Sequence, residues 1–137
     1  MHYPTILGTT LSIALSAAVS AAAELDVVVE GLTPEGRLML AVVQEPSGWS
    51  DDAPPLCAIN ARVTGPTMKF RLEVPDGKVA IRLFHDTNAN GELDTNLLGI
   101  PKEGYGFSQN PKVRGPASFE DAAFEVNGPT STIIRVK

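Results

Sequence analysis

The sequence predicts an all-β fold, specifically a seven-stranded antiparallel sandwich, and three observations support this. Apolar and polar residues alternate over short runs along the chain, which is the pattern of strands that bury one face. Clusters of Gly, Pro, Asn and Asp separate these runs, as turns do. No stretch after residue 23 has the period of a long amphipathic helix. Short strands between turns favour two packed sheets.

The first three strands show the alternation with different strength. Residues 24–30, ELDVVVE, place every second apolar side chain on one face. Residues 37–44, RLMLAVVQ, are apolar on both faces, which is typical of a central or covered strand. Residues 57–64, CAINARVT, alternate again and place the Cys57 thiol on the core side.

The last four strands complete the predicted sandwich. Residues 67–74, TMKFRLEV, and 78–85, KVAIRLFH, flank the turn PDG and are predicted to form a hairpin. Residues 121–126, DAAFEV, and 131–137, STIIRVK, are joined by the turn signal NGPT. Without a Cys–Trp–Cys spacing, the arrangement is expected to be immunoglobulin-like or transthyretin-like rather than an antibody-type domain.

Two loops are long for a domain of this size. They span residues 45–55, EPSGWSDDAPP, and a segment from Asp86 to about Ser118. Long loops in small domains are usually functional or held in place by specific contacts. The candidate binding groups of this chain lie in these two loops.

Residues 86–94, DTNANGELD, predict a calcium site. The expected ligands are the side chains at positions 1, 3, 5 and 9 of the pattern and the main-chain carbonyl at position 7, namely Asp86, Asn88, Asn90, Asp94 and Glu92. Gly91 at position 6 permits the bend that makes alternate side chains converge. Position 12 is Leu97, where a calcium hand has a glutamate, so Glu103 or the Asp51–Asp52 pair is expected to complete the shell.

The ion expected here is structural, because no nucleophile or base accompanies it in the sequence. Two carboxylate ligands predict weak binding, with a Kd on the order of 10⁻⁴ to 10⁻³ M, as in extracellular modules. The alternative is a metal-free polar turn. Asn90-Gly91 is a preferred type I′ pair, and Asp86 and Asn88 also cap turns.

Aromatic residues in the long loops are the candidate ligand-binding groups. Trp49 lies in the first loop, and Tyr105 and Phe107 lie in the second. These rings form either a platform for a ligand or anchors that pin the loops to the sandwich. The sequence favours anchors but leaves both open.

No catalytic residue is predicted. His85 is the only histidine after residue 23, and its parity places it on the core face of its strand. Zinc is disfavoured without a second histidine or a Cys-x-x-Cys pair. Ser108 lacks the pattern of a nucleophile elbow.

Residues 1–23 are predicted to be a signal peptide, followed by one domain at 24–137. The run from residue 5 to residue 23 has no charge and ends in small residues, so cleavage is expected before Glu24. A retained membrane anchor is the alternative, although the run is short and no basic stop signal follows it. The expected location is the periplasm or the medium, with no membrane span after cleavage.

The net charge and the cysteine content limit the classes of partner that the chain is expected to bind. The net charge is −5 and no block of Lys or Arg occurs, which disfavours nucleic acid and anionic membrane surfaces. Cys57 is the single cysteine, so an internal disulfide is excluded. A buried thiol is favoured over a reactive thiol or one that pairs with another chain.

The run FHDTNANGELDTNLLGIPKEGYGFSQN, together with LEVPDGKVAIRLFHD and FEDAAFEV, resembles a bacterial family of small exported proteins of unknown function. The resemblance covers most of the chain after residue 23 and implies an envelope or secreted β-sandwich without an assigned activity. The pattern D-x-N-x-N-G-x-x-D also looks like the calcium-binding B repeats of surface adhesins. That resemblance implies that the motif rigidifies the domain through Asp86, Asn88, Asn90 and Asp94.

The expected function is that of an exported binding or structural module of the cell envelope, stabilised by one calcium ion. Its partner is expected to be a protein, a peptide or a glycan that meets the long loops. One alternative is a carbohydrate-binding module that uses Trp49, Tyr105 and Phe107. A hydrolase or enzyme inhibitor that uses His85 and nearby carboxylates is the least supported alternative.

Overall fold

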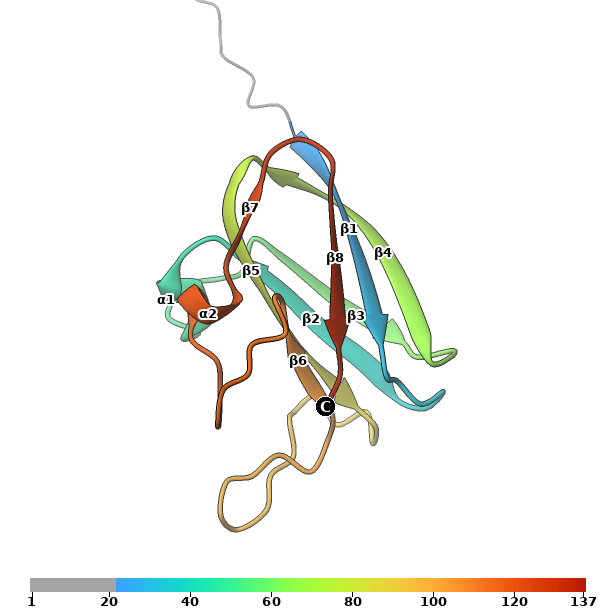
Figure 1. Ribbon diagram of the computed structural model, residues 1–137. Coiled ribbons are helices and arrows are strands. Elements are labelled where there is room, and N and C mark those ends of the chain that lie inside the picture. Colours follow the sequence, from blue (N-terminus) through green and yellow to red (C-terminus); the bar gives the residue numbers. More distant parts are fainter. Residues whose placement is uncertain (1–21) are drawn as a thin grey trace, which may run out of the picture.

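The computed structural model describes residues 22–137, which form two packed β-sheets (Figure 1). The predicted all-β sandwich is therefore confirmed. The described part contains eight strands and two four-residue helices: β1 (Ala22–Glu30), β2 (Arg37–Val43), α1 (Pro46–Trp49), β3 (Cys57–Arg62), β4 (Thr67–Pro75), β5 (Gly77–Asp86), β6 (Tyr105–Phe107), α2 (Phe119–Ala122), β7 (Phe124–Val126) and β8 (Thr130–Arg135).

The predicted signal peptide, residues 1–23, lies almost entirely outside the described residues. Its last two residues, Ala22 and Ala23, open β1 and pair with Pro75 and Val74. Cleavage before Glu24 stays a prediction, and it would remove these two pairs from the sheet.

One sheet has the order β4-β1-β8 and the other has the order β3-β2-β5-β6, while β7 pairs with the first residues of β5. Every neighbouring pair is antiparallel except β1 and β8, which run parallel. The parallel pair departs from the predicted antiparallel arrangement. It arises because the chain leaves β7 in one sheet and crosses at residues 127–129 to the other.

The predicted hairpin between residues 67–74 and 78–85 is wrong. β4 pairs with β1, and β5 pairs with β2, so the turn at Asp76 carries the chain from one sheet to the other. The Asp76 carboxylate accepts a hydrogen bond from the Gly128 main-chain N–H at 2.9 Å, which ties this corner to the β7–β8 connection. A hairpin and a sheet-crossing corner bury the same alternate residues, so the sequence pattern does not distinguish them.

The predicted strand at residues 121–126 begins instead as helix α2. The Ser118 hydroxyl accepts a hydrogen bond from the Asp121 N–H, and the Asp121 carboxylate accepts one from the Ser118 N–H. This capping box stabilises the first turn of a helix. The main-chain N–H of Ser118, and then its hydroxyl, lower the pKa of the Asp121 carboxyl by hydrogen bonding. Only residues 124–126 remain in a strand.

The core lies between the two sheets and consists of the alternate residues that the sequence pattern selected. Leu25, Val27 and Val29 of β1 are fully buried there. Cys57 packs against this core but is only half-buried, because β3 is an edge strand. On the opposite side, Tyr105 and Lys137 exchange two main-chain hydrogen bonds that join the sheets.

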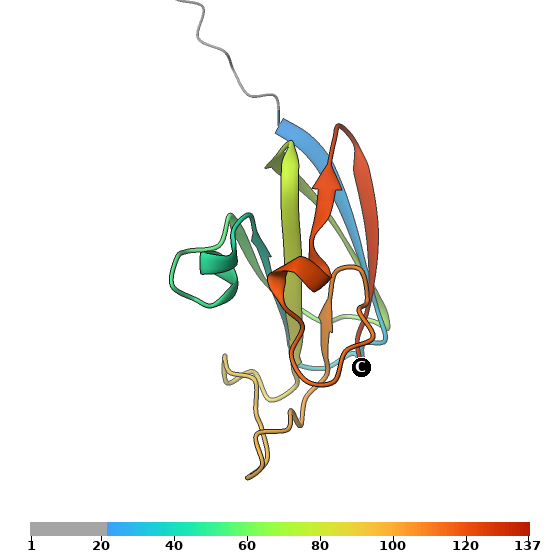
Figure 2. The ribbon, with the colours of Figure 1, turned by 60° about the vertical axis from the view of Figure 1, so that its left-hand side comes forward.

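A second, smaller apolar cluster covers part of the outer face of the five-stranded sheet. Val43 of β2 and Ala80 of β5 point outward there and are buried beneath Phe119 and Ala122 of α2. In Figure 2, α1 (teal) stands out to the left of the sheets and α2 (orange-red) is seen in front of β5. The covered strand predicted at residues 37–44 is therefore confirmed at one end of the sheet.

Candidate functional site

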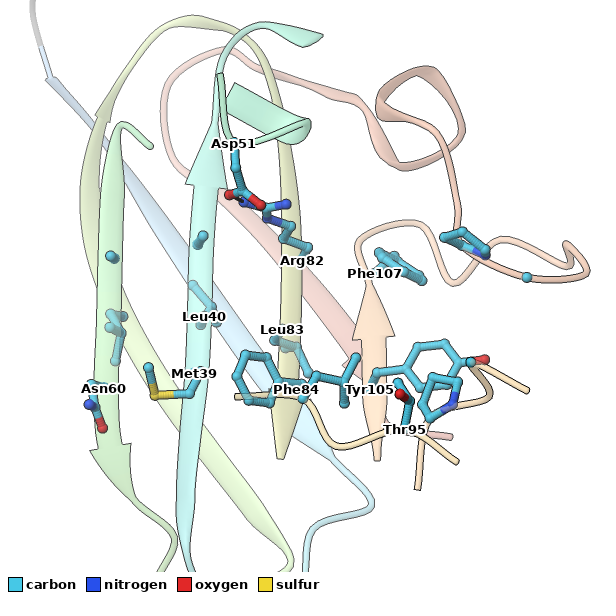
Figure 3. Close-up of a pocket in the computed structure, with 18 of the residues that line it drawn as sticks. Met39, Leu40, Asp51, Asn60, Arg82, Leu83, Phe84, Thr95, Tyr105 and Phe107 are labelled. Carbon is cyan, nitrogen blue, oxygen red and sulfur yellow. Dashed lines mark hydrogen bonds and ion pairs between the residues drawn. The ribbon is translucent and has the colours of Figure 1, made fainter. Parts of the chain in front are cut away.

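A groove of about 840 Å³ lies on the outer face of the five-stranded sheet (Figure 3). Two rows of side chains cross the sheet and form its floor. In the first row, Asn60, Met39, Phe84 and Tyr105 stand directly opposite one another on β3, β2, β5 and β6. The second row contains, in the same strand order, Ala58, Ala41, Arg82 and Phe107.

The hollow arises from the difference in size between the two rows. Ala41 and Ala58 are short, whereas Met39 and Phe84 beside them rise well above the sheet. Leu93, Ile100 and Pro101 of the β5–β6 loop add a rim on one side. The groove is thus apolar over most of its surface.

The three predicted aromatic residues lie close together, but only two of them line the groove. Tyr105 and Phe107 line the groove, with their ring centroids 5.8 Å apart. Trp49 does not line it, because it packs 5.7 Å from Phe107 and edge-on against Phe119 at 6.2 Å. The Trp49 indole N–H donates to the Ala117 carbonyl at 3.0 Å. Trp49 is therefore an anchor for the covering segments rather than an exposed platform.

The charged end of the groove is internally neutralised. Arg82 forms an ion pair with Asp51 and donates a hydrogen bond to the Trp49 carbonyl at 2.6 Å. Its guanidinium also lies 5.8 Å from the Trp49 ring centroid, a cation–π distance. Because Asp51 is engaged here, it is not placed to complete the predicted calcium shell.

The predicted calcium segment forms a compact polar loop directly after β5. The Asp86 side chain is 1% exposed and accepts hydrogen bonds from the main-chain N–H groups of Asn90 at 3.1 Å and Gly91 at 2.7 Å. The amides of Asn88 and Asn90 donate to the two carboxylate oxygens of Asp94 at 2.5 and 2.8 Å. Four of the five predicted ligands thus contribute side chains to one loop, while Glu92 donates its N–H to Asn90 at 3.0 Å.

Glu103 joins this loop, as one of the two predicted completions of the shell. One of its oxygens accepts from the N–H and hydroxyl of Thr87, and the other accepts from the Asp94 N–H at 3.2 Å. Glu103 is 8% exposed. Two buried carboxylates, Asp86 and Glu103, therefore belong to the same loop.

Neither buried carboxylate has a cationic partner. The ion pairs within residues 22–137 are Arg71–Asp26, Arg82–Asp51 and Arg135–Glu30. Across this part of the chain, no three His, Cys, Asp or Glu side chains are close enough together to hold a metal. An ion in this loop would consequently depend on amide and main-chain oxygens, as the predicted ligand set does.

His85 occupies the buried position that its parity predicts. The ring is 4% exposed, and Nε2 lies 2.7 Å from the Glu35 carbonyl oxygen. It faces away from the groove, whose floor is made by its neighbour Phe84 and the residues aligned with it. The geometry gives His85 a structural role.

Comparison with known protein families finds a match that covers most of the described residues. The model of DUF2141, described as an uncharacterized protein conserved in bacteria, matches residues 27–134. The chain belongs to this family. No curated protein and no solved structure matches it. Membership in DUF2141 confirms the predicted bacterial family of unknown function, and it brings no catalytic assignment.

In the part of the chain from residue 22 onward, none of the helices has the length and apolar character needed to cross a bilayer.

The sequence did not identify several groove residues as candidate binding groups, although apolar residues on the outward faces of two strands pointed to them. Met39 and Ala41 belong to the run RLMLAVVQ, whose two apolar faces indicated a covered strand. Phe84 likewise interrupts the polar face of KVAIRLFH. Apolar residues on the outward face of a strand require a cover or a ligand, but which residues share a row follows only from the strand order.

Proposed function

We propose that this protein is an exported binding module of the bacterial cell envelope whose ligand lies in the groove on the five-stranded sheet. The observation that carries the proposal is the groove itself. It is about 840 Å³ in volume, lies on the five-stranded sheet and is lined by Met39, Phe84, Tyr105 and Phe107. Concave, mostly apolar sites of this size are typical of ligand-binding pockets.

The chemistry of the walls favours an uncharged, largely apolar ligand. Arg82 and Asp51 neutralise each other at one end. The side-chain oxygen of Asn60 is occupied by a hydrogen bond from Arg37, so the Asn60 amide is left to act only as a donor toward a ligand. A carbohydrate-binding role through Trp49, Tyr105 and Phe107 is the weaker candidate, because Trp49 is engaged in packing.

The proposal includes a structural calcium ion in the 86–94 segment. Its support is the pair of buried carboxylates without cationic partners, since burying unpaired charge is costly. The resemblance of the segment to the B repeats of adhesins points the same way. In the proposed shell, the amides of Asn88 and Asn90 turn their oxygens toward the ion, and Asp94 and the Glu92 carbonyl complete it.

Asp94 would connect this ion to the groove. Its carbonyl accepts from the Lys102 N–H at 2.8 Å, and its N–H is held by Glu103. Its neighbours in the chain, Leu93 and Thr95, both line the groove. An ion that fixes Asp94 would therefore also fix one rim of the ligand site.

Binding of the uncharged fluorescent dye N-phenylnaphthylamine tests the proposal. Dye fluorescence should rise on binding to the protein and fall when an apolar competitor is added. Ala41→Phe fills the hollow without entering the core and should weaken dye binding at least about tenfold. Val28→Phe, which places the same aromatic side chain on the outer face of the other sheet, is the control and should bind normally.

Equal dye binding by the Ala41→Phe and Val28→Phe variants would reject the groove as the site. Displacement of the dye by soluble oligosaccharides, but not by apolar competitors, would mean that the ligand is a carbohydrate and not an apolar molecule. Both variants should keep the melting temperature of the unmodified protein to within a few degrees, because position 41 and position 28 both point away from the core.

A further inference from the structure

The tip of the β5–β6 loop, residues 95–101, exposes an unusual amount of apolar surface. Leu97, Leu98 and Ile100 are 107%, 83% and 55% exposed. The tip projects past the end of the sandwich (Figure 1). Its sequence, TNLLGIP, contains no charged residue. Single exposed aliphatic residues are ordinary, but three at one projecting tip mark an interaction surface.

Several main-chain N–H groups of the tip find acceptors within the tip itself. The Asn96 side-chain oxygen accepts from the N–H groups of Leu98 at 2.9 Å and Ile100 at 3.0 Å. The Asn96 N–H donates to the Ile100 carbonyl at 2.8 Å, and the Gly99 N–H donates to the Asn96 carbonyl at 3.0 Å. An extended bridge between Thr95 and Pro101 closes the base. A loop in water does not require this closure, whereas one that enters an apolar phase does.

We propose that residues 95–101 dock this protein onto a lipid surface by inserting Leu97, Leu98 and Ile100 among the acyl chains. The tip supplies what favours insertion, namely aliphatic side chains, internal acceptors for the N–H groups of Asn96, Leu98, Gly99 and Ile100, and no charge to desolvate. Leu and Ile are among the residues that enter bilayers most favourably. The inference goes beyond the groove and does not depend on the proposed function.

Charge selects the kind of lipid surface. The nearest charges on either side of the tip are Asp94 and Lys102, which are opposite in sign and joined through a main-chain hydrogen bond of 2.8 Å. The tip therefore prefers neither sign, while the net charge of −5 opposes an anionic surface. A zwitterionic lipid surface complements this charge distribution.

A protein partner is the less favoured occupant. Energetically dominant positions in protein interfaces are enriched in Trp, Tyr and Arg, and leucine is under-represented among them. The tip has neither an aromatic ring nor an arginine between residues 95 and 101. It also projects past the end of the sandwich (Figure 1), which suits insertion between lipids better than contact with a flat protein surface.

The position of the tip adds a second argument. Ile100 and Pro101 belong both to the tip and to the wall of the groove. Insertion of the tip would place the mouth of the groove at the lipid surface. An apolar ligand would then pass from the lipid to the groove without crossing water.

Flotation with phosphatidylcholine vesicles tests the proposal on the full chain. Intact-mass measurement determines at which residue the purified chain begins. The unmodified protein should float with the vesicles. The double variant Leu97→Ser, Leu98→Ser should partition at least about tenfold less, since each leucine contributes substantial apolar area. Ile133→Ser removes an exposed isoleucine from β8, away from the tip, and should partition as the unmodified protein does.

A second measurement reports on the tip alone. In Leu98→Trp, emission from the added tryptophan should shift to the blue with vesicles, while the unmodified protein, with only Trp49, should show no shift. Residues 5–23 are themselves apolar, but every variant carries the same N-terminus. Equal flotation of the double variant together with an unshifted Leu98→Trp spectrum would overturn the proposal. Self-association that the double variant loses, without vesicle binding, would do so in favour of a protein contact.

Flotation and dye binding separate the two proposals. Loss of flotation in the Leu97→Ser, Leu98→Ser variant with normal dye binding supports docking whether or not the groove binds a natural ligand. Normal flotation of the Ala41→Phe variant shows that docking does not require the groove.

Discussion

The two halves of the β5–β6 loop reverse the usual distribution of side chains. Residues 86–94 are rich in Asp and Asn, and the carboxylate of Asp86 is buried at their start. Residues 95–101 carry three large aliphatic side chains, all of them exposed. One half buries charge and the other exposes hydrocarbon. Each arrangement is costly in water alone, which is why we propose an ion for the first half and an apolar partner for the second.

The two halves of the loop are also held in place by different contacts. The first half is held to the sandwich by Asp86 and Glu103, which accept main-chain hydrogen bonds from within the loop. The second half contacts the sandwich less and is shaped mainly by Asn96. The first half should therefore determine folding stability, and the second should determine only what the protein contacts. Four predictions test this division, from the largest effect to the smallest.

Replacement of Gly36 should disturb the first half most. Gly36 has a φ of +63°, and a Cβ there would overlap the main chain of Asp86 and Thr87. Gly36→Ala therefore combines a strained backbone with a backbone clash, and we expect a loss of about 3 kcal/mol or more in the free energy of unfolding. Urea denaturation measures it. Gly115→Ala, which has a φ of +83° but open space around its Cβ, is the control and should cost about 1–2 kcal/mol.

Removal of the Asp86 carboxylate should have the next largest effect. Asp86→Ala removes the buried carboxylate that accepts hydrogen bonds from the N–H groups of Asn90 and Gly91. Because these are two hydrogen bonds to a charged group, a loss of about 2–4 kcal/mol is expected. The same carboxylate is a proposed ligand, so the variant should also lose any stabilisation by calcium. Asp52→Ala, at an exposed position, should change neither quantity. A fully stable Asp86→Ala variant would show that the first half does not control folding.

Calcium itself should raise the melting temperature by a smaller amount. With the Kd expected for this site, 10 mM calcium corresponds to about 1.4–2.7 kcal/mol, by the logarithm of concentration over Kd. For a domain of this size, that is a rise of roughly 5–15 °C relative to a chelator. Scanning calorimetry with calcium, magnesium and chelator measures it. An unchanged midpoint at 10 mM calcium would identify residues 86–94 as a metal-free polar turn.

The sequence predicted the first half of the loop better than the groove, for a physical reason. The ligands expected at residues 86–94 are contiguous, so their spacing alone indicates that they converge. The groove rows join side chains from four strands, and parity says only that Met39 and Phe84 face outward. Which strand lies beside which depends on long-range pairing, as the mistaken β4–β5 hairpin shows.

The sequence predicted some secondary-structure elements and not others. Strands with a clean period of two, such as β1 and β4, were found because one face of each is buried. The three-residue strand β6 was not, because Tyr105–Phe107 is too short to show a period. Helix α2 was missed because its capping box lies at Ser118, before the run that was read as a strand.

The exposed tip should contribute least to stability, and this is the sharpest test of the division. Leu97 and Leu98 are almost fully exposed to solvent, so exchanging both for serine removes little buried apolar area. The free energy of unfolding in Leu97→Ser, Leu98→Ser should stay within about 0.5 kcal/mol of the unmodified value. Urea denaturation without lipid measures it, with Leu25→Ser in the core as the contrasting variant. A loss above about 1 kcal/mol would mean that the leucines pack against the sandwich in solution. The tip would then be part of the fold, and its exposed hydrocarbon would no longer call for an apolar partner.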